Sequence, residues 1–262
     1  MNRIFAIGFW LFTAIGLYAQ QGAAVWGLGA NEANRDAGFG LSNNPGVAFT
    51  GKAIGGVWGQ QRFTGTTLVQ GGAALAFRSK GTLYGGDFSY SGTPNFSITR
   101  VHLSLCQIIS NQFNVGFSVG YATLYQSMLN NRPTRLSGRL GAAFQINEKW
   151  DASTVIINPW SRAYDGGLAV PAGALALGYR INMLTKAAFQ YRYNAQNQPV
   201  YGIAMRHEYG KRMVFNGALQ TGPEPISAGI EYKSASAVFA ISTRYHTYLG
   251  FSPAFSLIWT KR

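Results

Sequence analysis

Charged and polar side chains recur at alternate positions of several extended segments along the chain. Arginine and glutamate can bind ions or pair with one another, and histidine can carry a proton. The set comprises Arg100, His102, Arg139, Arg180, Arg192, Arg206, Glu208, Glu231 and Arg244. Because arginines outnumber carboxylates in it, the set predicts one of two interiors. One is a salt-bridged core that closes a barrel, and the other is a pore that selects anions or acidic ligands.

Nucleophilic catalysis has little support in the sequence. His102 and Ser104 lie on the same side of one predicted strand, as a serine and its base would, but any such pair two residues apart does so. HExxH, P-loop and dinucleotide-binding glycine motifs are missing. The match to GxSxG at residues 116–120 lies within a predicted strand and not at the strand-to-helix turn that this motif requires. Cys106 is the single cysteine, so neither an intrachain disulfide nor a cysteine metal cluster can form. We therefore expect no enzyme activity, catalytic residue, metal or cofactor.

The segment from Asn111 to Tyr121 shows how these polar positions are carried. Successive side chains of a strand point to opposite faces, so a period of two separates two surfaces. One surface here is apolar and aromatic, and the other is small and polar: Phe113, Val115, Phe117, Val119 and Tyr121 against Asn114, Gly116, Ser118 and Gly120. Lipid on one side and a polar lumen on the other require this pattern. Similar segments recur to the end of the chain.

The repeated segments predict an all-β fold, a transmembrane antiparallel up-and-down β-barrel of about 14 strands that occupies residues 52–262. Twelve strands remain an alternative. The predicted strands are 52–63, 66–78, 81–91, 95–108, 112–127, 134–146, 149–159, 168–180, 183–194, 199–209, 212–221, 225–234, 236–247 and 252–261. A secreted β-sandwich also alternates, but it needs charged outer faces that these strands mostly lack.

Composition agrees with a barrel in lipid. Only 12% of the 262 residues are charged, and glycine and aromatic residues are abundant. The formal charge of +13 comes from scattered lysines and arginines. Since they form no clustered run, nucleic acid is not an expected partner. We expect the positive charge to face outer-membrane lipid, lipopolysaccharide or the lumen.

The N-terminal part divides into two predicted segments. Residues 1–19 read as a signal peptide, with Arg3 before an apolar stretch too short to span a membrane. Residues 20–51 are rich in Gly and Asn and contain a dense turn signal. We interpret them as a leader that folds into the lumen as a plug, and a loose periplasmic tail is the alternative. The expected plug contacts are Glu32, Arg35, Asp36, Asn43 and Asn44.

Four short motifs resemble the PorV/PorQ-like, FadL-related outer-membrane barrels of the Bacteroidetes type. AGFGLSNNPGVAF at residues 37–49 resembles their NNPAGLA-like start, and INPW at 157–160 their mid-chain Asn-Pro-aromatic turn. GIEY at 229–232 and HTYLGFSP at 246–253 are similar to two further motifs of that group. This chain departs from the group in its short length and in ending WTKR rather than on an aromatic residue.

The resemblance implies a Gram-negative outer-membrane barrel of 14 strands with its N-terminal segment inside. The first function that it implies is type IX secretion or cell-surface protein handling, with secretion-system or cargo proteins as partners. The alternative is a FadL-like transporter of hydrophobic small molecules. A transporter should have a lateral gap, for which Pro171 and Gly55-Gly56 are candidates because both residue types weaken strand pairing. A small structural porin is the third possibility.

Overall fold

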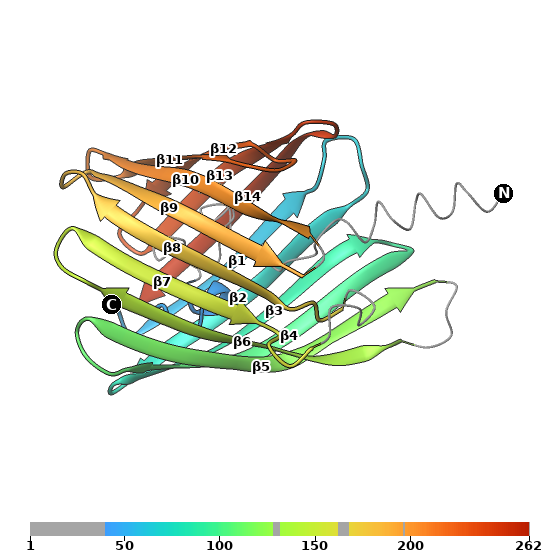
Figure 1. Ribbon diagram of the computed structural model, residues 1–262, viewed down its shortest axis with the longest axis horizontal. Helices are drawn as coiled ribbons and strands as arrows, with labels where there is room; N and C mark the ends of the chain where they lie inside the picture. Colours follow the sequence, from blue (N-terminus) through green and yellow to red (C-terminus); the bar gives the residue numbers. More distant parts are fainter. Residues whose placement is uncertain (1–39, 128–131, 162–167, 196, 262) are drawn as a thin grey trace.

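The computed structural model describes residues 40–127, 132–161, 168–195 and 197–261, and it is a closed antiparallel barrel of 14 strands (Figure 1). The predicted fold class is therefore confirmed. The strands are β1 (Ala53–Gln61), β2 (Val69–Ser79), β3 (Thr82–Thr93), β4 (Phe96–Ile108), β5 (Phe113–Gln126), β6 (Thr134–Gln145), β7 (Trp150–Ile157), β8 (Ala172–Arg180), β9 (Thr185–Asn194), β10 (Asn197–Tyr209), β11 (Met213–Gln220), β12 (Ile226–Lys233), β13 (Ala237–His246) and β14 (Gly250–Lys261). Each corresponds to one predicted strand, with ends that differ by up to four residues.

Pairing between the first and last strands closes the barrel. β1 meets β14 in unbroken register from Ala53 opposite Lys261 to Gln60 opposite Ala254. Gly55 and Gly56 are paired on both sides, so the lateral gap expected there is absent and that expectation is wrong. Pro171 lies just before β8, and its carbonyl accepts the Ala195 N–H, so it interrupts no strand either. Closure leaves no sheet edge in lipid with unsatisfied backbone groups.

The two ends of the barrel differ in their connections. The end that carries Lys52 and Lys261, where the C-terminus lies in Figure 1, has short turns, and we call it the short-turn end. In three of these turns a side-chain oxygen of Ser110, Asn147 or Asn182 accepts two following backbone N–H groups. Such side-chain turns fix the connection without glycine. The opposite end carries the connections after β1, β5 and β7 and is called the long-loop end.

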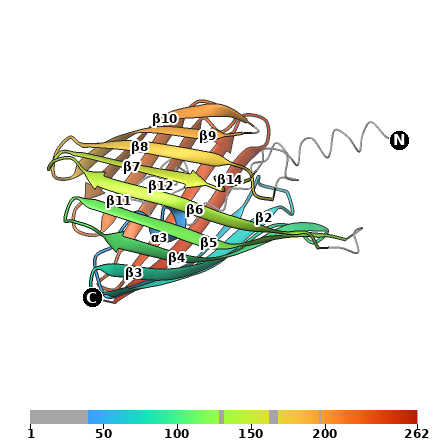
Figure 2. The ribbon, with the colours of Figure 1, turned by 60° about the horizontal axis from the view of Figure 1, so that its bottom comes forward.

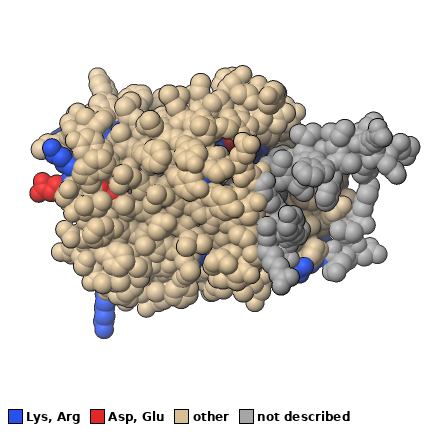
Figure 3. Space-filling model, in the orientation of Figure 1, with Lys and Arg blue, Asp and Glu red and all other residues tan. Residues whose placement is uncertain are grey.

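Alternation separates the outer wall from the lumen. On β4 the outward Leu103 is 69% exposed, whereas the neighbouring His102 is 1% exposed. The outer wall in Figure 3 is almost free of charged side chains, which gather toward the ends of the molecule. Water would not favour so broad an apolar surface on a monomer, but bilayer hydrocarbon would. No helix in the described part of the chain is long and apolar enough to cross a membrane.

A luminal segment, residues 40–50, enters the barrel before β1. It begins with the one-turn helix α3 (Gly40–Asn43), which lies inside the barrel in Figure 2 and contacts β3 and β4. Leu41 packs with the inward-facing Ala76, Leu83 and Cys106. The predicted luminal position therefore holds for residues 40–50. The signal peptide at 1–19 and the leader residues 20–39 lie outside the described residues.

Changing Leu103 to Arg tests the lipid-facing assignment of the outer wall. A guanidinium facing lipid at mid-bilayer depth should lower the free energy of unfolding by about 2–4 kcal/mol. The measurement is denaturant unfolding in lipid vesicles. Met183→Arg is the matched control, because Met183 is 96% exposed in a turn at the short-turn end and should change stability little. Equal costs for the two variants would contradict the assignment.

Candidate functional site

A row of inward positions crosses four strands at the middle of the barrel. Asp87 on β3 is opposite His102 on β4, and His102 is opposite Gly120 on β5. Gly120 is in turn opposite Ser137 on β6. A side-chain Cβ at Gly120 would collide with the backbone at Val101 and His102. The missing side chain therefore lets the His102 ring reach across β5 to Ser137.

These residues form a buried hydrogen-bonded chain that we call the polar belt: Asp87, His102, Ser137 and Asn158. His102 Nδ1 lies 3.3 Å from Asp87 Oδ2, and His102 Nε2 lies 3.0 Å from Ser137 Oγ. The Ser137 hydroxyl donates to Asn158 Oδ1 over 3.0 Å. All four residues are at most 5% exposed. Asn158 follows β7 in a left-handed conformation, φ 50°, which asparagine tolerates.

The belt has the connectivity of a serine–histidine–aspartate triad, but its hydrogens run the other way. A nucleophilic serine must donate its hydrogen to the histidine. Here the Ser137 hydroxyl donates to Asn158, whose Oδ1 also accepts the Gly138 N–H over 2.9 Å. Gly138 N–H is thereby used and does not serve an oxyanion. Ser104, the nucleophile considered from sequence, has no partner for its hydroxyl among the described residues, and the His102 ring turns to Ser137.

Arg139 joins the polar belt to the luminal segment. Its guanidinium lies 3.7 Å from Asp87 Oδ1 and also donates to the backbone carbonyl of Ser42, at the end of α3. Arg139 is 5% exposed and Asp87 is 4% exposed. One buried carboxylate is thus shared by a histidine and an arginine, and that arginine holds the luminal segment.

The turn Asn44-Pro45-Gly46 is seated on a pair of glycines in the wall. Gly116 on β5 and Gly141 on β6 are opposite each other and face inward. A Cβ at Gly116 would overlap Pro45 O, and one at Gly141 would overlap Asn44 Oδ1. The Asn44 side chain accepts the Gly46 N–H over 2.9 Å and donates to Thr154 O on β7 over 3.1 Å. Glycine at both wall positions is therefore required for this close approach.

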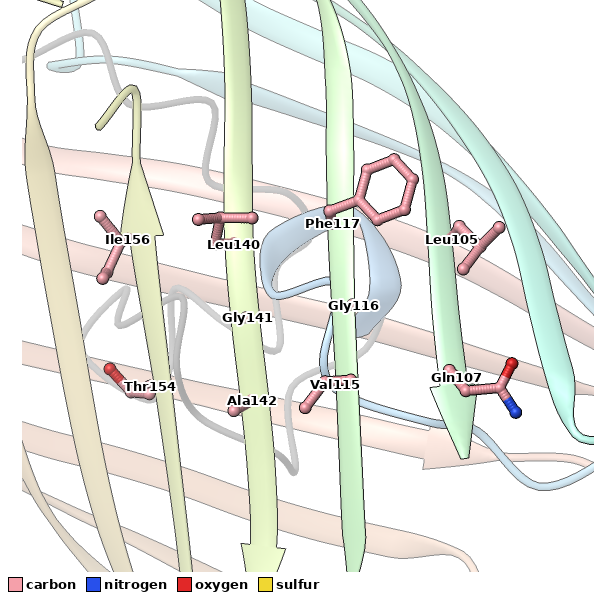
Figure 4. A pocket seen from close by; sticks show the side chains of 10 residues that line it. All are labelled: Leu105, Gln107, Val115, Gly116, Phe117, Leu140, Gly141, Ala142, Thr154 and Ile156. Atoms are coloured by element: carbon pink, nitrogen blue, oxygen red, sulfur yellow. The ribbon is translucent and has the colours of Figure 1, made fainter. Parts of the chain in front are cut away.

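The lipid-facing side of the same glycine pair is an apolar groove (Figure 4). The outer groove has a volume of about 530 Å³. Gly116 and Gly141 form its floor, and outward side chains of β4 to β7 form its walls: Leu105, Gln107, Val115, Phe117, Leu140, Ala142, Thr154 and Ile156. Figure 4 shows α3 and the chain that follows it directly behind the two glycines. Only backbone separates the groove from the luminal segment at this point.

Further ion pairs line the lumen around the rest of the barrel. Near the short-turn end, Glu231 accepts from Arg206 over 2.5 Å and from Asn216 over 2.6 Å. Glu208 pairs with Lys233 over 2.7 Å, and Asp151 pairs with Lys186 over 2.6 Å. These pairs join neighbouring or next-neighbouring strands, so they resist sliding of one strand past another.

Glu224 gathers two arginines at the long-loop end. It lies 2.9 Å from Arg62 and also pairs with Arg244. Burial, together with the nearby positive charge of Arg192, lowers the pKa of Arg62 to about 10, so this guanidinium is still protonated at neutral pH. Arg62 and Glu224 lie in loops, and with Arg244 they connect the ends of β1, β12 and β13, which lie on either side of β14 or next to one another in the wall.

The structure places the predicted polar set on inward-facing positions. Arg100, His102, Arg139, Glu231 and Arg244 are buried, Arg192, Arg206 and Glu208 are half-buried, and Arg180 is exposed at the short-turn end. Asn43 and Asn44 are buried in the luminal segment. Glu32, Arg35 and Asp36 lie outside the described residues. The described part of the chain holds no group of His, Cys, Asp or Glu side chains suited to a metal ion.

Sequence reasoning missed Asp87, Arg62 and Glu224. Asp87 alternates with Ser89 against Phe88 and Tyr90, so the period-two pattern itself could have found it. Arg62 and Glu224 lie in loops, where no periodic signal tells which way a side chain points.

Comparison with known proteins places the fold. No family model matches the chain, and no curated protein matches it in sequence. Solved structures that share the fold include the CymD monoaromatic hydrocarbon channel (TM-score 0.69, 13% identity, covering 91% of this chain and 97% of CymD). The Pseudomonas putida toluene transporter TodX also shares it (TM-score 0.62, 10% identity, covering 92% of this chain and 97% of TodX). So does a Pseudomonas aeruginosa FadL homologue (TM-score 0.62, 11% identity, covering 92% of this chain and 98% of the homologue). The chain thus has the architecture of FadL-type outer-membrane barrels.

Changing Gly141 to Ala tests the seating of the luminal turn. The added methyl group has no room against Asn44, so the turn must shift and the free energy of unfolding should fall by about 1–3 kcal/mol. Gly217→Ala on β11 is the control, since its nearest contact would be an ordinary 3.7 Å from Ser227 O. Unfolding of both variants in detergent micelles checks this. A Gly141→Ala barrel as stable as the control would contradict the close seating.

Changing Glu224 to Gln removes the carboxylate that Arg62 and Arg244 share. Because both guanidiniums are buried, we expect a loss of about 3–5 kcal/mol in the free energy of unfolding. Glu148→Gln is the matched control, because Glu148 is exposed in a short turn and its change should have little effect. If the Glu224→Gln variant had the same free energy of unfolding as the unsubstituted protein, the shared carboxylate would contribute nothing to stability.

Proposed function

We propose that this barrel carries small hydrophobic molecules across the outer membrane of a Gram-negative envelope, without catalysing a reaction. The observation that carries the proposal is the thin wall at Gly116 and Gly141. An apolar groove open to lipid lies on its outer side, and the luminal segment lies against its inner side. A porin for polar solutes needs no apolar groove on its outer wall. An apolar solute that leaves the barrel toward lipid needs an apolar surface of this kind along its route.

The route implied by this geometry is lateral, through the wall between β5 and β6. The two strands are paired without interruption from Phe113 opposite Phe144 to Thr123 opposite Thr134, so the barrel as described is closed. Passage requires the Asn44-Pro45-Gly46 turn to leave its seat and the strands to part locally. At the glycine pair no side chain holds the two strands together across the inner face, which makes this the weakest part of the pairing.

The compared structures support the chemical class of the solute. CymD is described as a monoaromatic hydrocarbon channel and TodX as a toluene transporter, and both share this architecture. We propose small apolar molecules of that kind as the cargo, and outer-membrane lipid and lipopolysaccharide as the surroundings of the exposed wall. Type IX secretion, which the motif resemblance implied first, has no support among these comparisons, so it stays a prediction.

Filling the outer groove tests the proposal. Cells of a host that lacks such channels would express the unsubstituted barrel or the Ala142→Trp variant, and uptake of radiolabelled toluene would be followed. The indole should occupy the groove, so uptake should fall to the level of cells without the barrel. Ala228→Trp, on the outer face of β12 across the barrel, should retain full uptake.

Two outcomes would count against the proposal. One is an unsubstituted barrel that raises toluene uptake no further than an empty vector does. The other is equal uptake by the Ala142→Trp and Ala228→Trp variants, which would remove the groove from the route.

A further inference from the structure

Lysine occurs at one end of this barrel only. Every lysine of the chain lies in a turn, at a strand end or next to one at the short-turn end: Lys52, Lys80, Lys149, Lys186, Lys211, Lys233 and Lys261. Figure 3 shows basic side chains that project from this end of the molecule. Arginine is distributed differently, since Arg139 lies in the lumen and Arg132 at the long-loop end. Lysine alone therefore distinguishes the two ends.

Most of these lysines face solvent without an ion pair. Lys186 pairs with Asp151, and Lys233 pairs with Glu208. The others form no ion pair with a carboxylate in the described part of the chain, and all of them are exposed. We call them the lysine rim: Lys52, Lys80, Lys149, Lys211 and Lys261.

Positive charge is densest where the barrel closes. The Lys52 N–H donates to Lys261 O over 2.9 Å, and the Arg78 N–H donates to Lys52 O over 2.8 Å. Three cationic residues thus follow one another across neighbouring strands. β14, β1 and β2 contain no Asp or Glu. Like charges on paired strands repel each other, so this seam favours an anion from outside the chain.

Outward aromatic rings lie just inside the lysine rim. Three pairs of them meet across neighbouring strands at this end: Phe77 with Tyr84, Trp150 with Tyr179, and Tyr209 with Phe215. Trp259 on β14 is also outward and 45% exposed. Such rings are typical of the membrane–water interface, at the level of the lipid headgroups.

Each aromatic position has a rim lysine a little further from the middle of the barrel. Lys80 follows Phe77 by three residues, and Lys149 immediately precedes Trp150. Lys211 and Lys261 follow Tyr209 and Trp259 by two residues each. A strand advances about 3.3 Å per residue, so the ammonium groups lie up to about 10 Å beyond the rings. Lipid phosphates are found at that depth.

The chemistry of lysine suits a lipid phosphate. Its ammonium group is a compact charge on a long flexible stem, so it can follow a mobile headgroup while the stem covers apolar surface. The rim lysines are also spread around the barrel, near β14 to β2, β6 to β7 and β10 to β11. A ring of lipids touches all of these places at once, whereas a docked acidic protein would cover one side.

We propose that the lysine rim binds the phosphate groups of anionic phospholipids, and that the seam at Lys52 and Lys261 contributes most. Short turns of outer-membrane barrels face the periplasm, so the lipids belong to the periplasmic leaflet. The rim thereby fixes the depth at which the barrel sits in the membrane. This role is independent of what the barrel carries.

Brominated lipids test the proposal, because bromine quenches the fluorescence of a nearby indole. Trp150 and Trp259 lie next to Lys149 and Lys261 and report on the lipid there. The full barrel would be reconstituted in phosphatidylcholine vesicles that contain brominated phosphatidylglycerol or brominated phosphatidylcholine. The anionic lipid should associate several-fold more strongly than the neutral one. High salt should lower this ratio, since exposed charges are screened.

Two double variants with the same change in net charge locate the effect. Lys52→Gln with Lys261→Gln should lower the ratio several-fold. Arg132→Gln with Arg135→Gln, at the long-loop end, is the matched control and should leave it unchanged. Lys52→Arg with Lys261→Arg keeps the charge and should keep the ratio. A ratio near one in the unsubstituted barrel, or an equal loss in the two glutamine variants, would overturn the proposal.

Soluble anions separate a lipid from the other occupants of such a surface. Glycerol 3-phosphate carries the phosphate without acyl chains, and polyglutamate imitates an acidic protein. Neither should reduce quenching by brominated phosphatidylglycerol at millimolar concentration in a buffer of constant ionic strength. Displacement of the lipid by either anion would assign the rim to a soluble partner and contradict the lipid assignment. Toluene uptake is not measured, so failure of the transport proposal leaves this result readable.

Discussion

Backbone hydrogen bonding is the constraint on which the rest of this structure depends. In hydrocarbon each N–H and C=O needs a partner within the protein, and a sheet meets that need only when its first strand pairs with its last. β1 and β14 do so from Ala53 opposite Lys261 to Gln60 opposite Ala254. In a closed barrel, every side chain of a strand points either to lipid or to the lumen. The aromatic and aliphatic outer wall and the charged interior are consequences of that division.

Charge inside the lumen is distributed so that buried cations have carboxylates nearby. Glu224, Glu231 and Asp87 each contact one or two cations that come from another strand or loop. Buried ion pairs seldom add much stability over apolar packing, but removal of one partner is costly. Their value here is in fixing how nearby strands of the wall are aligned with one another. Arg139 goes further, because it connects the wall to a segment that is not part of the barrel.

Glycine has two distinct roles in the wall. At Gly120 the missing side chain lets a histidine reach a serine two strands away. At Gly116 and Gly141 it lets the backbone of the luminal turn touch the backbone of the wall, and it leaves a groove on the lipid side. Both roles concern what lies next to the glycine, not its backbone conformation. Both close approaches lie within the same four strands, β3 to β6.

The fold could be predicted from the sequence because alternation is local. Phe113 to Tyr121 shows by itself which residues face lipid, and the same pattern located the 14 strands and the inward arginines on them. Pro171 marks the limit of this reasoning. The strand predicted from residue 168 begins only at Ala172, because a proline has no N–H to give to the ladder.

By itself, the sequence determined which face each side chain takes, since a period of two needs no knowledge of neighbours. Only the tertiary structure decided which inward residues meet. Ser137 rather than Ser104 is the partner of His102, and Asn44 reaches Thr154, because register and closure place distant residues side by side. Those contacts depend on how strands are staggered around the barrel, and no local pattern carries that information.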